Sequence, residues 1–528
     1  MINILYSKKL NNYLYIAWLL MILYGVLIIP PRVDDGIYLL PAINELLGKS
    51  PSIGFSGIYE PIFFIFPTQS YLHGQFLKLV NFFGMDLSLQ TYRTFNGIST
   101  FILLLLIKKL FDLRYDESRN VIFNTNLTLI TLGFFSQFSF QFFINRPEII
   151  GLVFYTAGLI YTLKALNNRA LTNDSNYAGI FTGLTSIVHP HFFIIAVPIQ
   201  LYLSWQLMNQ YSKKKFYLNL LFYIIPILFY LYWILLNFDS FQDQVLHRTG
   251  EVFIDGLALS LKYIWQIISE NLSVQTIYLK IYMLTFVITI LGNIFLLFSV
   301  ERVNTKNSHF ENIFKITTLS MLFILLIIQP FRPYFMMISF LSIISLISLG
   351  LGISKISIRE TIFENNLKTK FIYLIFILMS LSMIFSNETK RFFVDNFEDK
   401  FSTQYFVETA LINEKNIFIT SGLLIPYFSE SIVANKKNII WFFPTAVQPS
   451  EKFKKYFYRE ILNYKDLYKD STWGLLSKEV IQTNYGVCAN LKLNGKYLNL
   501  KKPKLLFSDR MTVFLKSINA SIDNKCLN

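Results

Sequence analysis

The stretch Arg32-Val33-Asp34-Asp35-Gly36 places two adjacent carboxylates directly after the first long apolar segment, which runs from about Asn12 to Pro30. Ionisable groups at the edge of a membrane span are costly and usually mark a functional cavity. The apolar segment has no small-residue cleavage site and continues into Pro30-Pro31, so we expect a retained anchor rather than a cleaved signal peptide. The sequence therefore predicts a hydrophobic helix that delivers an acidic pair to the water interface.

Composition assigns the whole chain to the membrane class. Hydrophobic residues make up 53% of its 528 residues, aromatic residues make up 17%, and the mean hydropathy is +0.44. Soluble globular chains lie far from these values. A span needs roughly 20 apolar residues, and about eleven segments approach that length, two of them short (177–188 and 315–329). The predicted spans are 12–30, 93–108, 121–143, 147–165, 177–188, 191–208, 217–237, 275–299, 315–329, 333–352 and 371–387.

Lysine and arginine gather in every second loop between these predicted spans. They precede the first span and follow the second, fourth, sixth, eighth and tenth, as in Lys8, Lys109, Lys164, Lys213, Arg302 and Lys355. Short cytoplasmic loops carry the excess of positive charge in membrane proteins. The alternation predicts a cytoplasmic N-terminus, and the odd number of spans predicts an extracytoplasmic C-terminus. We expect a multi-pass protein of a bacterial inner or plasma membrane.

The unusual polar motifs all fall in the remaining loops, on the opposite side of the membrane. They are Asp34-Asp35, Arg146-Pro147-Glu148, His189-Pro190-His191 and Arg332-Pro333-Tyr334. Each of the first three motifs also has a purely structural interpretation. The acids could be solvated interfacial residues, the second motif could be a charged turn, and the histidines could be snorkelling residues beside a helix-breaking proline. Arg332 differs because it opens an apolar run, where a guanidinium offers a planar fork for phosphate oxygens. Their common side nevertheless indicates one shared site.

In this order the motifs resemble the GT-C superfamily of transferases that use polyprenyl-phosphate-linked sugars, which includes protein O-mannosyltransferases and lipid A aminoarabinose transferases. The resemblance covers most of residues 30–350 and rests on Val33 to Tyr38, Pro67 to Leu79 with Gly84, Thr91 to Gly97, Asn145 to Glu148, Gly183 to His191, and Arg332 to Tyr334. One departure is Phe66-Pro67-Thr68, where the family often has His-Pro-Pro. The resemblance implies an α-helical polytopic membrane protein that transfers a sugar, with inversion, to a hydroxyl acceptor on a lipid, glycan or protein.

The resemblance also implies roles for individual residues. Asp34 or Asp35 would be the base or would orient the acceptor, and Asp34 is preferred because it comes first after the span. A sugar phosphate carries its own leaving group, so one carboxylate and one or more cations suffice, and no cofactor is certain. The residues implied in lipid phosphate binding are Arg332, Tyr334, Arg146, His189 and His191.

Residues 31–92 form the predicted first outer loop. Its dense apolar residues, interrupted by Pro61, Pro67, Gly74 and Gly84, predict helices lying along the membrane surface. Glu60 and His73 lie in this loop and are weak candidates for a divalent metal site, since two ligands at that separation indicate little.

The chain is expected to divide into two domains. Residues 1–387 would form the transmembrane catalytic domain, and residues 388–528 would form a small extracytoplasmic α/β domain. The C-terminal α/β domain is predicted from short β-like runs at 416–420, 438–443 and 511–515, which lie between charged stretches.

Other classes of function were weighed against this interpretation. The formal net charge of +15 does not indicate nucleic-acid binding, because much of it sits in the loops predicted to be cytoplasmic, and contact with anionic membrane lipids is expected instead. A transporter or lipid flippase is the main alternative, but no inverted internal repeat is visible. A non-catalytic assembly protein with a degenerate site is the third possibility.

Overall fold

The protein is described here by a computed structural model. It describes residues 7–28, 33–55, 58–63, 67–113, 126, 129, 146–167, 173–210, 213–246, 308–323, 397–411, 414, 416–419, 424–433, 438–441, 471–475, 481–484, 488–493, 496–501, 504–508, 513–517 and 519–523. Arg332 and Tyr334 lie outside these residues, as do the predicted spans at 275–299, 333–352 and 371–387 and nearly all of 121–143.

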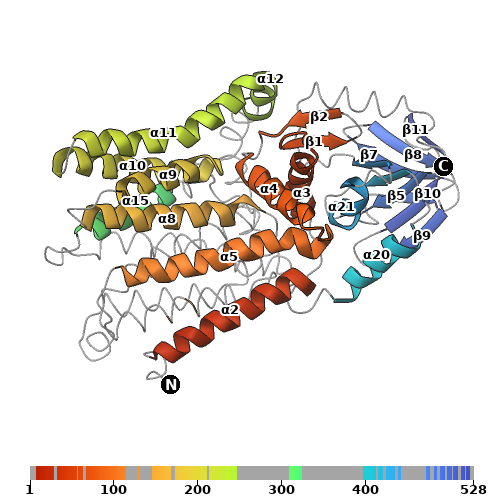
Figure 1. The fold of residues 1–528 in the computed structure, drawn as a ribbon. Helices are drawn as coiled ribbons and strands as arrows, with labels where there is room; N and C mark the ends of the chain where they lie inside the picture. The colour runs from red at the N-terminus through yellow and green to blue at the C-terminus, as the bar shows by residue number, and fades with distance from the viewer. Residues whose placement is uncertain are drawn as a thin grey trace, which may run out of the picture.

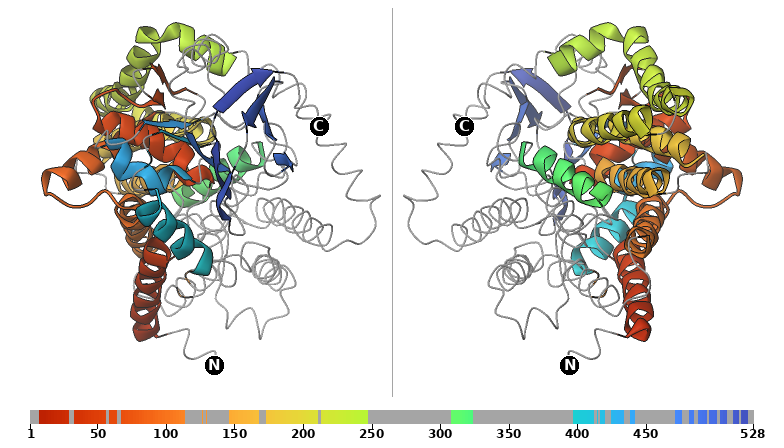
Figure 2. Two further views of the ribbon diagram at one scale, coloured as in Figure 1. Left: turned by 90° about the vertical axis from the view of Figure 1, so that its right-hand side faces the viewer. Right: turned by 90° about the vertical axis from the view of Figure 1, so that its left-hand side faces the viewer.

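Long helices run side by side between two ends of the molecule (Figure 1; Figure 2). They are α2 (Lys8–Ile28), α5 (Leu89–Asp112), α8 (Pro147–Asn167), α10 (Pro190–Gln210) and α11 (Lys213–Leu236), with the shorter α9 (Asp174–Ser186) and α15 (Ser308–Phe323) packed among them. Within the described part of the chain, four helices are long and apolar enough to cross a membrane: Lys8–Leu27, Pro147–Leu166, His191–Asn209 and Lys213–Leu236. These match four predicted spans, and the total of about eleven stays a prediction.

Two of the other predicted spans, 93–108 and 177–188, coincide with the helices α5 and α9, which are not among these four. α5 has 24 residues, a length of about 36 Å at the rise of an α-helix, and carries Arg93 near its start and Lys108 and Lys109 near its end. α9 has 13 residues, about 20 Å, so it is too short to cross a hydrocarbon core of about 30 Å alone. α9 is short because the chain turns at residues 187–189 and a new helix, α10, begins at Pro190. A proline is well tolerated at the first position of a helix, because the backbone N–H at that position makes no hydrogen bond within the helix.

Small and polar residues fix α9 between α10 and α11. Gly179 and Gly183 let the backbone of α9 approach the carbonyl groups of Asn219 and Tyr223 so closely that an added Cβ would clash. Gln200 of α10 donates a hydrogen bond to Asn219 Oδ1 at 2.6 Å and accepts one from Thr182 Oγ1 at 2.9 Å. These contacts hold the turn after α9 in place, and that turn carries His189.

The segment after α2 folds at one end of the helix bundle (Figure 1). It forms α3 (Val33–Leu46), a hairpin of β1 (Ser52–Phe55) and β2 (Ile58–Pro61), and α4 (Thr68–Phe82). α12 (Phe238–Phe241) and the π-helical η1 (Gln242–Leu246) follow α11 at the same end. Gln244 accepts a hydrogen bond from the Phe63 backbone N–H at 2.8 Å and donates one to Pro61 O at 2.9 Å, so η1 secures the chain after the hairpin.

The part of the chain described after residue 396 forms helices and two sheets. The five-stranded sheet has the order β4-β3-β5-β10-β9, with β3 (Asn416–Ile419) parallel to both β4 (Asn438–Trp441) and β5 (Ser471–Leu475). β10 (Val513–Ser517) runs antiparallel to β5 and to β9 (Lys504–Ser508). A four-stranded antiparallel sheet has the order β11 (Asn519–Asp523), β8 (Lys496–Lys501), β7 (Cys488–Leu493) and β6 (Ile481–Asn484). β3 and β4 thus lie within the runs predicted at 416–420 and 438–443, and the run predicted at 511–515 overlaps β10.

This C-terminal part packs beside α3. α20 (Phe397–Thr409) and α21 (Ile425–Val433) lie next to the five-stranded sheet, and α21 contacts both α3 and α5. Ser429 of α21 donates a hydrogen bond to Leu87 O at 3.2 Å. The predicted domain boundary at residue 387 lies outside the described residues.

Candidate functional site

The acidic pair opens α3, where a carboxylate is favoured by the partial positive charge of a helix N-terminus. The Asp35 side chain is buried, and its Oδ2 accepts a hydrogen bond from Arg93 Nη2 at 3.0 Å. Arg93 is 1% exposed and also donates from Nη1 to Gly25 O at 3.4 Å. The ion pair therefore joins α3 to α5 and to the last turns of α2.

Sequence reasoning assigned no role to Arg93, although it lies within the Thr91 to Gly97 motif. The available signal was an arginine in the first turns of an apolar helix, which calls for an acidic partner. The sequence alone does not show whether Asp34 or Asp35 is that partner, because the choice depends on how α3 packs against α5.

Tyr38 links α3 to the first charged motif. The Arg146 guanidinium lies over the Tyr38 ring, 5.3 Å from its centroid, and the Tyr38 side chain is buried. This contact places the first turns of α3 against the start of α8.

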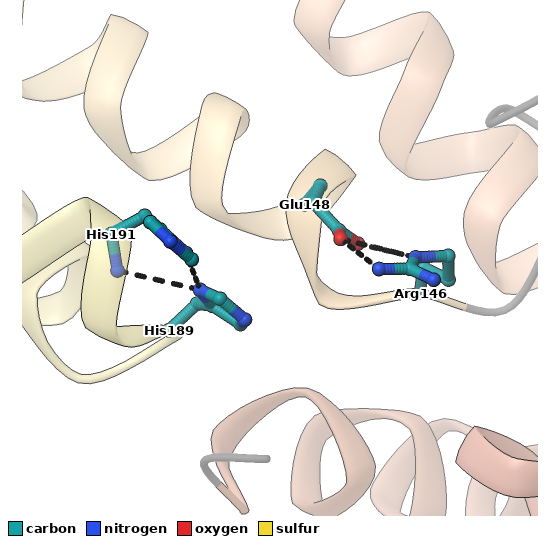
Figure 3. Close-up of polar contacts among 4 residues, drawn as sticks. All are labelled: Arg146, Glu148, His189 and His191. Atoms are coloured by element: carbon teal, nitrogen blue, oxygen red, sulfur yellow. Dashed lines mark hydrogen bonds and ion pairs between the residues drawn. The ribbon is translucent and has the colours of Figure 1, made fainter. Parts of the chain in front are cut away.

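Arg146 and Glu148 form a buried ion pair at the start of α8 (Figure 3). Arg146 Nη2 lies 2.6 Å from Glu148 Oε1, and Arg146 Nε lies 3.0 and 3.1 Å from the two carboxylate oxygens. Pro147 stands between the two residues as the first residue of α8, where a proline is well tolerated. The predicted charged turn is thus a charged pair inside the protein.

His189 and His191 form a stacked pair on either side of Pro190 (Figure 3). Their ring centroids lie 4.7 Å apart and their Nδ1 atoms 2.8 Å apart, and both side chains are buried. Burial, together with the nearby positive charge of Arg146, lowers the pKa of His189 to about 3. His189 is therefore neutral at physiological pH and offers a hydrogen bond rather than a charge.

The weak metal candidates lie in different elements. Glu60 is buried in β2, and His73 is buried in α4, stacked on Phe95 with ring centroids 4.7 Å apart and edge-on to Tyr92. Such an aromatic environment is typical of a core histidine. Among the residues that the structure describes, no group of three or more His, Cys, Asp and Glu side chains is placed to hold a metal ion.

Three predicted motifs thus meet at one end of the bundle: the acidic pair on α3, the Arg146–Glu148 pair on α8 and the histidine turn before α10. The helices carry basic residues near their opposite ends, at the start of α2 and α11 and at the end of α5 and α8 (Figure 1). The predicted separation of polar motifs from basic loops is therefore present in the fold. The fourth motif, Arg332 and Tyr334, lies outside the described residues.

No protein-family model and no curated protein matches the chain. Solved structures do match. The structure of ArnT from Cupriavidus metallidurans bound to undecaprenyl phosphate is similar over 97% of this chain and 98% of that one, with a TM-score of 0.60 at 10% sequence identity. The chain therefore shares the fold of ArnT. The predicted resemblance is confirmed at this level, and the protein is an integral membrane protein.

An oligosaccharyltransferase from Archaeoglobus fulgidus, in the apo form, gives a weaker match. The similarity extends over 89% of this chain and 70% of that one, with a TM-score of 0.43 at 14% identity. The archaeal oligosaccharyltransferase AglB from the same organism, in complex with an inhibitory peptide and a dolichol-phosphate, has a TM-score of 0.40 at 12% identity. Scores this low add nothing to the argument from ArnT.

Proposed function

We propose that the protein is a membrane glycosyltransferase that moves a sugar from a polyprenyl-phosphate donor to a hydroxyl acceptor on the extracytoplasmic side, with inversion. The observation that carries this proposal is the convergence of the helix bearing the acidic pair with Arg146 and the histidine turn. The fold shared with ArnT, which was solved with undecaprenyl phosphate bound, supports the class of donor.

Asp34 is the proposed base. Asp35 is committed to Arg93, and an ionised carboxylate in a buried ion pair is held in place rather than available for proton transfer. Asp34 would take the proton of the acceptor hydroxyl while the hydroxyl oxygen attacks the anomeric carbon from the face opposite the phosphate. The bond between that carbon and the phosphate oxygen breaks, and the lipid phosphate leaves with the electron pair.

The lipid phosphate would be held by Arg332, Tyr334, Arg146, His189 and His191. A cation in a low-dielectric site stabilises a departing phosphate far better than it would in water. Because Arg146 already pairs with Glu148, we assign the main positive charge to Arg332 and its fork of N–H donors. His189 would add a neutral N–H donor, and Tyr334 would add a hydroxyl donor.

The proposal includes the expected topology and domains. The end of the bundle with α3 and α4 would face the extracytoplasmic side, with α3 and α4 as the helices of the first outer loop, residues 31–92. Residues 1–387 would be the catalytic membrane domain and 388–528 the extracytoplasmic domain. The proposed chemistry does not depend on a metal, and a chelator titration would test the possible divalent metal for which Glu60 and His73 are weak candidates.

The transporter or flippase alternative is not favoured. Transporters bind their substrates near the middle of the membrane, at broken helices. The charged and histidine motifs described here gather at one end of the bundle instead. The proposal names only classes of substrate. The transferred sugar is a hexose or a pentose, and the acceptor is a lipid, a glycan or a protein.

A comparison of cells tests this function. Cells with the gene deleted would be complemented with the wild type or with Asp34→Asn, and their envelope glycans and lipid-linked sugars would be profiled by mass spectrometry. We expect loss of one glycan modification and accumulation of one polyprenyl-phosphate sugar, restored by the wild type alone. Unchanged profiles in the deletion strain would refute the proposed function.

A further inference from the structure

The backbone fixes which ring nitrogens of the histidine pair carry protons. The His191 backbone N–H, which can only donate, points to His189 Nδ1 at 3.4 Å, so His189 Nδ1 is an acceptor and carries no proton. Neutral His189 then carries its proton on Nε2. The 2.8 Å contact between the two Nδ1 atoms needs one proton, and His191 Nδ1 must supply it.

The His191 ring therefore presents a lone pair at Nε2. A second proton on that ring would bury a positive charge beside neutral His189, which is unfavourable. His191 is 4% exposed, and its Nε2 atom is enclosed with no hydrogen-bond partner among the residues that the structure describes. Leaving a buried acceptor without a donor costs free energy, so this atom calls for a partner.

The chemistry of a lone pair restricts that partner. A phosphate oxygen is itself an acceptor and would be repelled by the lone pair at His191 Nε2. The part of His191 in the proposed phosphate site is therefore to position His189 through its Nδ1–H, and its Nε2 atom does not contact the lipid phosphate. A metal ion would be a suitable partner for an imidazole nitrogen, but the described residues provide no group of three ligands around it. A hydroxyl group donates the hydrogen that the lone pair needs.

We propose that His191 Nε2 accepts a hydrogen bond from a hydroxyl group of the donor sugar, and so selects for a sugar over the bare lipid phosphate. This inference rests on the proposed function and deepens it. In a sugar phosphate the ring is bonded directly to the phosphate oxygen, so a histidine pair beside the phosphate also reaches the sugar hydroxyls. His189 Nε2–H donates toward the phosphate, and His191 Nε2 accepts from the sugar.

Two substitutions separate the two nitrogens of His191. In His191→Asn the amide nitrogen takes the place of Nδ1 and keeps the hydrogen bond to His189, but nothing replaces Nε2. In His191→Gln the amide oxygen reaches the Nε2 position and restores an acceptor there. His309 on α15 is the matched control, because its Nδ1 also lies in a hydrogen bond, 2.9 Å from Tyr202 OH, away from the histidine turn.

The test measures binding of two lipids to the full-length protein in nanodiscs. The lipids are undecaprenyl phosphate and the best-bound of its glucose, mannose and aminoarabinose conjugates. We expect His191→Asn to weaken binding of the sugar lipid by about tenfold, the loss of one buried hydrogen bond, and to leave binding of undecaprenyl phosphate unchanged. His191→Gln should recover most of the loss, and His309→Asn should match the wild type.

Three results would overturn the inference. Equal losses for both lipids in His191→Asn would make His191 a phosphate or structural residue, and unchanged binding of both would leave Nε2 without a substrate partner. A wild type that binds neither lipid would refute the proposed function itself. If His191→Asn does not fold, monodeoxy analogues of the sugar lipid test the wild type, and equal binding of every analogue would refute the inference.

Discussion

Removal of the Arg93 charge should destabilise the protein, and removal of both charges should restore most of the stability. Arg93 and Asp35 are 1% and 3% exposed and lie 3.0 Å apart, so neither charge is solvated by water. Arg93→Met keeps a similar side-chain volume but leaves Asp35 without this partner. Breaking a buried pair in this way costs about 3–5 kcal/mol, whereas replacing both members of a pair is often close to neutral.

The assay is thermal or denaturant unfolding of the purified protein in one detergent, with Arg93→Met, Asp35→Asn and the double variant measured together. We expect Arg93→Met to lower the free energy of unfolding by about 3 kcal/mol or more and Asp35→Asn to restore most of it in the double variant. Lys78→Met is the control, because Lys78 also pairs with a carboxylate, that of Glu45, but is 38% exposed and should cost about 1 kcal/mol or less. A loss in the double variant equal to the sum of the two single losses would refute the coupling of α3 to α5 through this pair.

Three further predictions concern other parts of the account. Arg332→Ala should be nearly inactive, and Arg332→Lys, which keeps the charge but loses the fork, should raise the apparent KM for the lipid-linked donor with little change for the acceptor; an unchanged donor KM and kcat in Arg332→Ala would make it a structural residue. Cysteine labelling in cells should find Lys213 inside and Lys452 outside, and a cytoplasmic Lys452 would contradict the predicted number of spans. Because the folded-state pKa of His189 is about 3 against 6.5 for an ordinary histidine, its neutral form stabilises the fold fully above pH 6.5, and this stability is lost as the pH falls from 6.5 toward 3. His189→Asn should therefore lose less stability than the wild type between about pH 7 and pH 5, and an equal loss would count against the buried neutral ring.

The sequence was sufficient for the elements that depend on local pattern. α2, α8, α10 and α11 follow from uninterrupted apolar runs of the length that a bilayer requires. The separation of polar motifs from basic loops follows from the alternation of charge along the chain. The family resemblance predicted the fold of the lipid A aminoarabinose transferases, and the similarity to ArnT confirms the fold.

Features that depend on tertiary contacts could not be predicted from the sequence. Arg93 and Asp35 are 58 positions apart, and which acid the arginine meets depends on how α3 is rotated against α5. The length of α9 depends on the turn before Pro190 and on glycines that pack against α11, neither of which is visible in mean hydropathy. The protonation of the histidine pair depends on a backbone N–H in the turn between them.

The central claim is that position 34 supplies the base for sugar transfer. The direct measurement is release of undecaprenyl phosphate from a lipid-linked sugar by purified protein in nanodiscs, in the presence of envelope acceptors, for the wild type, Asp34→Asn and Asp35→Asn. The account predicts that Asp34→Asn folds like the wild type and turns over about 100- to 10,000-fold more slowly, the range typical of a general base, because the amide keeps the shape but cannot take the proton. Wild-type turnover in Asp34→Asn would contradict the claim, and loss of turnover in a well-folded Asp35→Asn alone would move the base to Asp35.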